Sequence, residues 1–339
     1  MGRGDSRDCA VVKGLPAYAA LDLGTNNCRL LIACPTADGF RVIDSFSRII
    51  RLGEGIARTG RMSEAAIDRA MSALRVCRDK MLAKNTRRTR LIATEACRAA
   101  ANAGDFCERV ERELGLALEV IDRKTEAMLA VTGCLPLLDP AARGALLFDI
   151  GGGSSELVRL ERDPDHPFAP AKIKGWISLP VGVVTLAEHH GGTEVTSESY
   201  TAMVDEVAQQ LASFAADHSA DMQGVHLLGT SGTVTTVAGI YLNLPRYDRR
   251  RVDGIWMKDA DVTQTIGRLR AMSYSDRINN GCIGAERGDL VLAGCAILDA
   301  IRAAFPCDRL RIADRGLREG MLVEMMREDG VVIGRQAVG

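Results

Sequence analysis

Three glycine-rich turns each follow an apolar stretch and carry hydrogen-bond donors. They read GTNN after Asp22, GGGSS after Asp149 and GTSGT after Leu228. Glycine lets backbone N–H groups approach an anion, and serine or threonine adds a hydroxyl donor. Three such turns are harder to obtain by chance than one, so the pattern favours phosphate binding over plain turns. The predicted phosphate-binding residues are Gly24, Thr25, Asn26, Arg29, Gly151, Gly152, Gly153, Ser154, Ser155, Gly229, Thr230, Ser231, Gly232 and Thr233.

Several other motifs are excluded. The sequence contains no Gly-Lys dipeptide, which rules out a Walker P-loop, and no GxGxxG follows a strand. GTSGT does not form a nucleophile elbow, because position 233 is threonine where that motif requires glycine. No HExxH and no CxxC occurs, so a zinc site has no support.

Carboxylates accompany two of the glycine turns. Asp22 and Asp149 each end an apolar strand directly before a turn, and Glu156 follows seven residues after Asp149 on the returning strand. Mg²⁺ prefers oxygen ligands and retains several waters, so carboxylates at this position suit a cation that bridges protein and phosphate. We therefore predict Asp22, Asp149 and Glu156 as metal-site residues for Mg²⁺, with Mn²⁺ as the alternative.

The elements that position these residues repeat once. Residues 18–34 form a predicted hairpin around the first turn, and residues 144–160 repeat the pattern around the second. Asp22 and Asp149 lie 127 residues apart, which is about one domain and far too long for a solenoid repeat. Strands and helices alternate through the rest of the chain, so the sequence predicts an α/β fold built by duplication.

The overall composition agrees with a globular enzyme. The 339 residues are 47% hydrophobic and suffice for two domains. The net charge of −1 and the 4% of aromatic residues argue against nucleic-acid binding. No apolar run is long enough to span a membrane. Ten cysteines without CxxC pairs favour a reducing cytoplasm.

Five motifs together resemble a known family. The segments ALDLGTNNCRLLI, ATEACRAAAN, DIGGGSSELV, GTSGT and ADRGLREGML resemble, in order and spacing, the exopolyphosphatase/guanosine pentaphosphate phosphohydrolase family. This family belongs to the superfamily of actin, sugar kinases and heat-shock chaperone ATPases. The resemblance extends from about Tyr18 to Met326 and implies two ribonuclease-H-like domains with the active site in the cleft between them.

The resemblance also implies a mechanism and its residues. The family uses Mg²⁺ and attack by water on the terminal phosphorus. Its catalytic glutamate lies in a motif like SGxEEA, which here reads DRKTEA and makes Glu126 the expected base. Asp122, Arg123 and Thr125 depart from the usual Ser, Gly and Glu. Arg98 matches a phosphate-contacting arginine, and Glu156 is the next candidate for the base.

The expected positions of these residues follow from local sequence. Thr125 is expected to cap a helix that runs through Val131, which puts Glu126 in a first turn where the helix dipole favours a carboxylate. If the segment around them is helical, Asn102 lies on the same face as Arg98, one turn further on.

The domain boundaries and substrate follow from the same resemblance. We expect a flexible leader (1–16), an N-terminal actin-like domain (17–126), a C-terminal one (127–330) and a tail (331–339), with the option that the last helix packs on the first domain. The expected protein is a homodimeric exopolyphosphatase acting on inorganic polyphosphate. Guanosine pentaphosphate is the alternative substrate. An ATP-driven actin-like binding protein and a sugar kinase are the alternatives from other classes.

Overall fold

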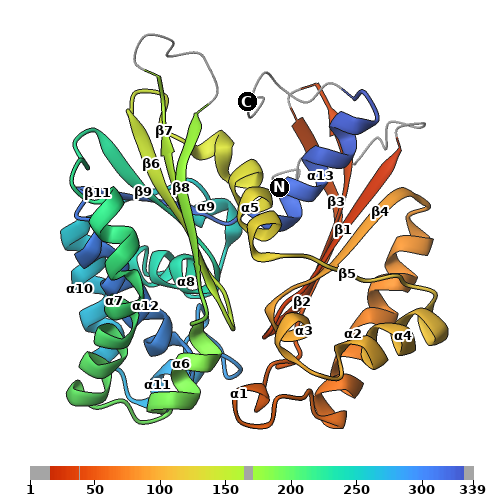
Figure 1. The fold of residues 1–339 in the computed structure, drawn as a ribbon, viewed down its shortest axis with the longest axis horizontal. Coiled ribbons are helices and arrows are strands. Elements are labelled where there is room, and N and C mark those ends of the chain that lie inside the picture. The colour runs from red at the N-terminus through yellow and green to blue at the C-terminus, as the bar shows by residue number, and fades with distance from the viewer. Residues whose placement is uncertain (1–15, 38, 164–170, 332–339) are drawn as a thin grey trace, which may run out of the picture.

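The chain folds around two mixed β-sheets. The structure is a computed structural model and describes residues 16–37, 39–163 and 171–331. The first sheet has the strand order β3-β2-β1-β4-β5 and the second the order β10-β11-β9-β6-β7-β8. Figure 1 shows them as two lobes. The strands are β1 (Ala17–Leu23), β2 (Asn27–Thr36), β3 (Gly39–Ile49), β4 (Thr86–Ala93), β5 (Glu119–Val120), β6 (Gly144–Ile150), β7 (Ser155–Glu161), β8 (Lys172–Leu179), β9 (Val225–Thr230), β10 (Trp256–Lys258) and β11 (Arg309–Ala313).

The two sheets share one topology. In the first, β1, β2 and β3 form an antiparallel meander and β4 lies parallel to β1. In the second, β6, β7 and β8 form the same meander, β9 lies parallel to β6, and β11 follows parallel to β9. Strand β10 extends this sheet at its edge. The repeated order confirms the predicted α/β class with two ribonuclease-H-like domains.

Helices cover both faces of each sheet. The first lobe carries α1 to α4, and Ser63 caps α2 as its sequence indicates, accepting a hydrogen bond from the Ala66 N–H. The second lobe carries α6 to α12. The helices are α1 (Ile56–Thr59), α2 (Glu64–Ala83), α3 (Glu95–Ala99), α4 (Ala103–Leu114), α5 (Arg123–Cys134), α6 (Val183–His190), α7 (Ser197–His218), α8 (Gly232–Tyr241), α9 (Arg249–Val252), α10 (Asp259–Ala271), α11 (Tyr274–Asn279), α12 (Val291–Ala304) and α13 (Leu317–Glu328).

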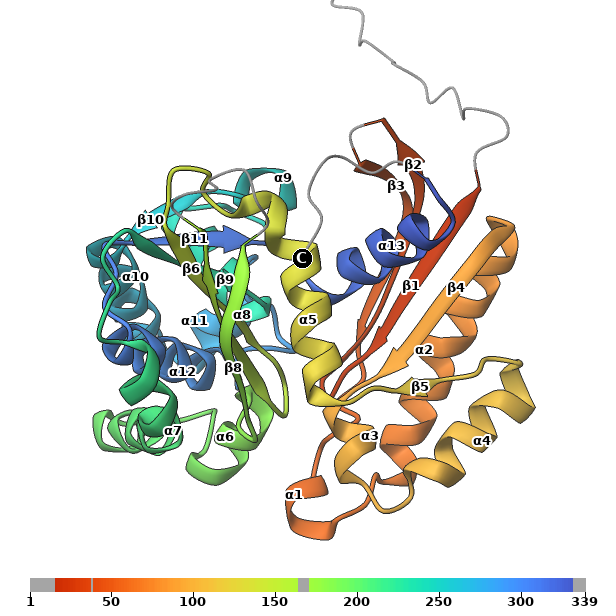
Figure 2. The ribbon, with the colours of Figure 1, turned by 45° about the horizontal axis from the view of Figure 1, so that its top comes forward.

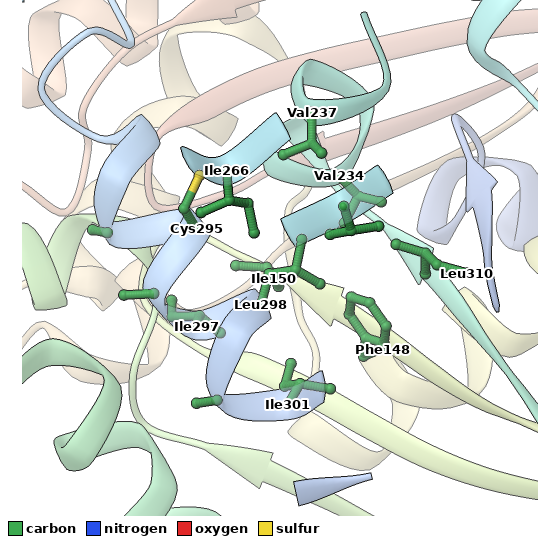
Figure 3. Packing of buried hydrophobic residues seen from close by; sticks show 14 of the residues in the cluster. Phe148, Ile150, Val234, Val237, Ile266, Cys295, Ile297, Leu298, Ile301 and Leu310 are labelled. Carbon is green, nitrogen blue, oxygen red and sulfur yellow. The ribbon is translucent and has the colours of Figure 1, made fainter. Parts of the chain in front are cut away.

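The core of the second lobe lies between β6 and the helices on its outer face. Leu146, Phe148 and Ile150 alternate along β6 and pack with apolar residues of α8 and α12. Figure 3 shows Val234 and Val237 of α8 and Ile297, Leu298 and Ile301 of α12 around Phe148 and Ile150. The strand is buried on both faces, which explains why it reads as a continuous apolar run in the sequence.

Two helices, α5 and α13, lie between the sheets (Figure 2). Helix α5 packs on β6 and β7 of the second sheet, and α13 packs on β1 and β2 of the first. The C-terminal helix therefore returns to the first sheet, where Arg88 on β4 pairs with Glu328 and Asp329 at the end of α13. The predicted division at residue 126 falls inside α5. The predicted leader and tail lie almost entirely outside the described residues.

One local expectation was wrong, and the condition set for a second is not met. Asp122, not Thr125, caps α5: its Oδ1 accepts a hydrogen bond from the Thr125 N–H at 2.7 Å, because the helix begins at Arg123, three residues earlier than expected. Asn102 does not share a helical face with Arg98, because α3 ends at Ala99. Its side chain is buried and bonds to both the N–H and the C=O of Met62.

The contact between α5 and α13 gives a stability prediction. A Cβ added at Gly320 of α13 would lie 2.0 Å from the carbonyl oxygen of Leu129 on α5, so the helices must separate to accept alanine. We expect Gly320→Ala to lower the free energy of unfolding by about 3 kcal/mol. Gly267→Ala is the matched control, because this helical glycine has no atom within 4 Å of the added Cβ.

The control substitution should raise stability by about 0.5–1 kcal/mol, since alanine restricts the unfolded chain more than glycine does. Urea unfolding of both variants measures the difference. A Gly320→Ala variant as stable as the unmodified protein would contradict the close packing of the two helices.

Candidate active site

A cleft of about 550 Å³ lies between the two sheets. Both lobes, α5 and the loop before α13 contribute to its wall. The charged residues that line it are Asp22, Arg29, Glu126, Asp149, Glu156, Arg249, Arg287, Asp314, Arg315, Arg318 and Glu319. Each of the five sequence motifs therefore contributes at least one residue to the wall of this cleft. Arg98 is not among them.

Strand alternation brings the two aspartates into this cleft. Tyr18 and Ala20 on β1 pack toward α13, so Asp22, two residues further, lies on the same face. Ala145 and Leu147 on β6 pack toward α5, which places Asp149 on that face. Because α5 and α13 both lie between the sheets, the duplicated aspartates face one another across the cleft.

The hairpin register supplies each aspartate with a charged neighbour. Asp22 on β1 is the direct cross-strand partner of Arg29 on β2, and Asp149 on β6 is the partner of Glu156 on β7. Direct partners in an antiparallel pair point to the same side. Glu156 therefore lies beside Asp149, as predicted. At this position the first lobe presents a cation where the second presents a carboxylate.

Two of the glycine turns touch each other. A Cβ added at Gly152 would lie 2.9 Å from Thr25 Cβ, and one at Gly153 would lie 2.8 Å from Thr25 Oγ1. Only glycine permits this approach. The turns GTNN and GGGSS thus meet at one end of the cleft, where Gly24, Asn26 and Gly151 line its wall.

Part of the predicted phosphate-binding set has structural contacts instead. The Ser155 hydroxyl donates to the Val181 carbonyl, and the Ser154 hydroxyl donates to Glu156 Oε1 at 2.7 Å. Gly229 lies within β9, where a Cβ would meet the ring of Phe148 at 2.6 Å. Together with Thr25, Gly152 and Gly153, these residues do not line the cleft. Their glycines and hydroxyls shape the loops rather than face the cavity.

The third turn opens onto two arginines. Ser231 has φ 132°, an uncommon conformation for a residue with a side chain, and its hydroxyl caps α8. A Cβ at Gly232, the first residue of α8, would lie 3.6 Å from Arg287 Nη1 and 3.9 Å from Arg29 Nη2. The positive end of a helix dipole and two guanidinium groups therefore converge at this turn, which also includes Thr230 and Thr233 in the cleft wall.

The side chains of three arginines in the cleft make no hydrogen bond or ion pair to another described residue: Arg29, Arg287 and Arg318. Burial lowers the pKa of Arg287 and of Arg318, and the charge of Arg29 adds to both effects. Partly buried guanidinium groups without carboxylate partners are costly unless an anion joins them. Arg287 lies in no motif of the sequence and Arg318 lies within ADRGLREGML, and neither was among the predicted site residues.

Glu126 lines the cleft and belongs to a network of ion pairs. Its Oε2 accepts from Arg98 Nη2 at 2.8 Å, and the same guanidinium pairs with Glu95 at 2.8 Å. Arg123 pairs with the second oxygen of Glu95, also at 2.8 Å. Arg98 thus holds Glu126 in place, and its side chain does not line the cleft itself.

The buried carboxylates that line the cleft repel one another. Burial, the charge of Glu156 and that of Asp22 raise the pKa of Glu126 well above its usual value, against the opposing effect of Arg98. Burial and the charge of Asp149 raise the pKa of Glu156 to about 7, although the hydroxyls of Ser154 and Ser178 stabilise its charged form. Carboxyls that titrate near neutral pH are suited to proton transfer.

The predicted metal site can be tested against these residues. Within the described ranges, no group of three or more His, Cys, Asp or Glu side chains is close enough together to hold an ion alone. The buried Oδ1 atoms of Asn26 and Asn27 make no hydrogen bond to any described residue, and they share the cleft with Asp22 and Asp149. This set of oxygen donors fits a hydrated Mg²⁺ that takes its remaining ligands from water and phosphate.

Asp149 offers a test of this electrostatic arrangement. Burial raises its pKa to about 6, with the charge of Arg29 opposing the shift and that of Asp22 adding to it. The folded protein therefore binds more protons than the unfolded chain between about pH 4 and pH 6, so this carboxyl costs stability as the pH rises through that window. We expect Asp149→Asn to unfold at higher urea than the unmodified protein at pH 8 without metal, by about 1–3 kcal/mol.

At pH 4 the two proteins should differ little, because Asp149 is then protonated in the folded state. Asp205→Asn on the exposed face of α7 is the control and should not change stability at either pH. If Asp149→Asn gave no gain at pH 8, the carboxyl would not carry the proposed electrostatic cost.

These features define the class of protein: a two-lobed α/β fold of duplicated topology, with paired carboxylates in the cleft between the lobes and arginines there that pair with no other described residue. The model of the Ppx/GppA phosphatase family matches residues 31–329, and the chain belongs to this family.

Similar sequences carry two different names. The chain is 28% identical over 311 residues to the guanosine-5'-triphosphate,3'-diphosphate pyrophosphatase of Aeromonas salmonicida (strain A449), covering 92% of this chain and 60% of that protein. It is 27% identical over 330 residues to exopolyphosphatase 2 of Mycobacterium tuberculosis (strain H37Rv), covering 92% and 99%. The chain thus spans about 60% of the length of the Aeromonas relative and nearly all of the mycobacterial one.

Solved structures share the fold. The crystal structure of the Aquifex aeolicus member of the Ppx/GppA family is 28% identical, with a TM-score of 0.74, and covers 93% of this chain and 99% of that one. An exopolyphosphatase-like protein is also 28% identical, with a TM-score of 0.81 and coverage of 92% and 99%. No helix among the described residues combines the length and apolar character that crossing a membrane requires.

Proposed function

We propose that this chain is an exopolyphosphatase that hydrolyses the terminal phosphate of inorganic polyphosphate. The observation that carries the proposal is the trio of arginines, Arg29, Arg287 and Arg318, without carboxylate partners among the described residues, in the same cleft as Glu126 and Glu156. A polyanion supplies the negative charge that these arginines lack, and a carboxylate in the same cleft activates the water.

The reaction needs little from the protein beyond position and charge. A water oxygen attacks the terminal phosphorus, the bond from that phosphorus to the bridging oxygen breaks, and the shortened chain leaves with that oxygen. Glu126 orients the water and accepts its proton, and Arg98 fixes the carboxylate that does so. Glu156, held by two hydroxyls, is the second acceptor within the same cleft. Mg²⁺, when bound near Asp22 and Asp149, neutralises charge on the phosphate oxygens.

The family contains a second activity that fits the same cleft. The Aeromonas relative is named for guanosine-5'-triphosphate,3'-diphosphate. The N-terminus of α8, with Arg29 and Arg287 beside it, suits the phosphates of a nucleotide as well as those of a polymer. Guanosine pentaphosphate is therefore the alternative substrate. An actin-like ATP-driven binding protein or a sugar kinase would use the fold for another purpose.

Three further properties belong to the proposal. Mg²⁺, or Mn²⁺ in its place, is the expected cofactor, on the oxygen donors of Asp22, Asp149 and the two asparagines. A cytoplasmic location suits the described cysteines, of which none forms a disulfide. The homodimer follows from the family resemblance. Gel filtration with light scattering would test it, and a monomer at micromolar concentration would rule it out.

The test of the function is orthophosphate release with Mg²⁺ from polyphosphates of defined length, guanosine pentaphosphate and ATP, measured side by side. The proposal expects fastest release from polyphosphate. Faster release from guanosine pentaphosphate would mean that the same site residues act on the alternative substrate. Sugar-dependent loss of ATP without orthophosphate would indicate a kinase, and ATP binding without release from any substrate would favour the binding protein.

A further inference from the structure

A second hollow lies behind the ion-pair network and outside the main cleft. Its volume is about 660 Å³, and none of its lining residues lines the main cleft. We call it the outer pocket; the helices and strand that carry it can be followed in Figure 2. Its residues come from α3, the start of α5 and β8: Glu95, Arg98, Ala99, Asp122, Arg123, Lys124 and Trp176.

Only a thin partition separates the two hollows. Thr94 lines the main cleft, and the next residue, Glu95, lines the outer pocket. Glu126 lines the main cleft, and Arg98, 2.8 Å away, lines the outer pocket. A Cβ added at Gly153 of the second glycine turn would lie 3.1 Å from Glu95 Cγ. The partition is therefore one layer of side chains.

Ion pairs, rather than apolar packing, form this layer. Arg98 is shared between Glu95 and Glu126, and Arg123 holds the other oxygen of Glu95. A phosphate offers a guanidinium the same kind of bidentate contact as a carboxylate does. Such a layer can exchange its carboxylate partners for a phosphate without opening an apolar core.

On the outer side of this layer, exposed cationic side chains can bind an anion weakly. The Arg123 side chain is 41% exposed, and Lys124 is exposed beside it. Asp122 is engaged at the helix N-terminus, where it caps α5. Three cationic and two anionic side chains line the pocket. This balance suits brief contact with a small anion better than tight retention of a long polyanion.

We propose that orthophosphate, once cleaved, leaves through the outer pocket, passing from Arg98 to Arg123 and Lys124. The inference rests on the proposed function. The product forms beside Glu126, while the shortened chain still occupies the cleft toward Arg287 and Arg318 and blocks that route. A second opening lets the product leave while the chain stays bound.

A plug at the pocket mouth tests this route. Ala99 is exposed and lines the outer pocket, whereas Ala101 is exposed and does not, so Ala99→Trp and Ala101→Trp form a matched pair. Neither substitution adds atoms to the core. Rapid acid quench measures all orthophosphate cleaved in the first turnover, and a fluorescent phosphate sensor measures only what has left the protein.

We expect Ala99→Trp to cleave polyphosphate within 2-fold of the unmodified rate and to release free orthophosphate at least 10-fold more slowly, with Ala101→Trp unchanged in both. Release from Ala99→Trp at the unmodified rate, or equal slowing of cleavage and release, would overturn the exit route. Absence of cleavage in the unmodified protein on any phosphoanhydride would instead overturn the proposed function.

Product inhibition gives an independent readout. If orthophosphate re-enters by the outer pocket, added orthophosphate should lower the maximal rate on polyphosphate without raising KM. Purely competitive inhibition would mean that product and chain share the main cleft, which contradicts the proposal.

Discussion

Glu126→Gln is expected to lose at least about 100-fold in kcat while still binding polyphosphate, because glutamine keeps the shape of the side chain and cannot accept a proton from water. The Arg98 guanidinium retains Glu95 as its partner in this variant, so the ion-pair layer stays largely intact. Turnover by orthophosphate release and binding by equilibrium titration with polyphosphate separate the two effects.

Glu108→Gln is the control, since this exposed glutamate on α4 lies outside both hollows. Near-normal turnover by Glu126→Gln would remove it as the base and direct attention to Glu156.

The raised pKa values predict further that kcat/KM rises with pH as Glu126 and Glu156 lose their protons, with the Glu156 limb centred near pH 7 in the free protein.

Arg98→Ala should reduce kcat/KM by about 100-fold or more, equivalent to about 3 kcal/mol, with KM raised as well as kcat lowered. Its removal leaves Glu126 without a cation and raises the pKa of that carboxyl further, because Arg98 is the group that lowers it. The variant also leaves Glu95 paired with Arg123 alone.

Arg98→Lys should restore little of the loss, because an ammonium cannot bridge Glu95 and Glu126 with a planar, bidentate fork. Arg112→Ala, with a side chain 69% exposed, is the control. Steady-state kinetics at a temperature where all variants remain folded provide the comparison. An unchanged KM and kcat in Arg98→Ala would place this arginine outside the reaction.

The sequence was sufficient to predict the paired-aspartate frame of the site. The repeated pattern of apolar strand, aspartate and glycine turn predicted two equivalent hairpins, and alternation along a strand then fixes the side toward which Asp22 and Asp149 point. The seven-residue spacing of Asp149 and Glu156 around a tight turn also made them cross-strand neighbours. These features are local, so pattern and period determine them.

Contacts between distant segments could not be predicted in the same way. Arg287 reaches the turn before α8 from a loop with no recognisable motif, and only the assembled fold brings Gly232 to it. Arg88 and Arg90 lie in none of the five motifs, yet both pair with glutamates of α13 more than 230 residues away. Ion pairs at such separations depend on the path of the chain rather than on local sequence.

Local chemistry also left choices open that packing decided. Asp122 and Thr125 are both good N-caps, and the strand β5 that ends at Val120 decides between them by delivering the chain at Asp122. Glycine is required in GGGSS for contact with Thr25 as much as for access to phosphate. A glycine motif shows that something approaches closely, and only the structure shows what it is.

The most direct test of the account is hydrolysis of polyphosphate in ¹⁸O-labelled water with Mg²⁺, followed by mass analysis of the products. Attack of water on the terminal phosphorus predicts one ¹⁸O in each released orthophosphate and none in the remaining chain. Three results would contradict water activation by Glu126 at the terminal phosphate. They are ¹⁸O in the remaining chain, orthophosphate released without ¹⁸O, and transfer of the phosphate to an added acceptor.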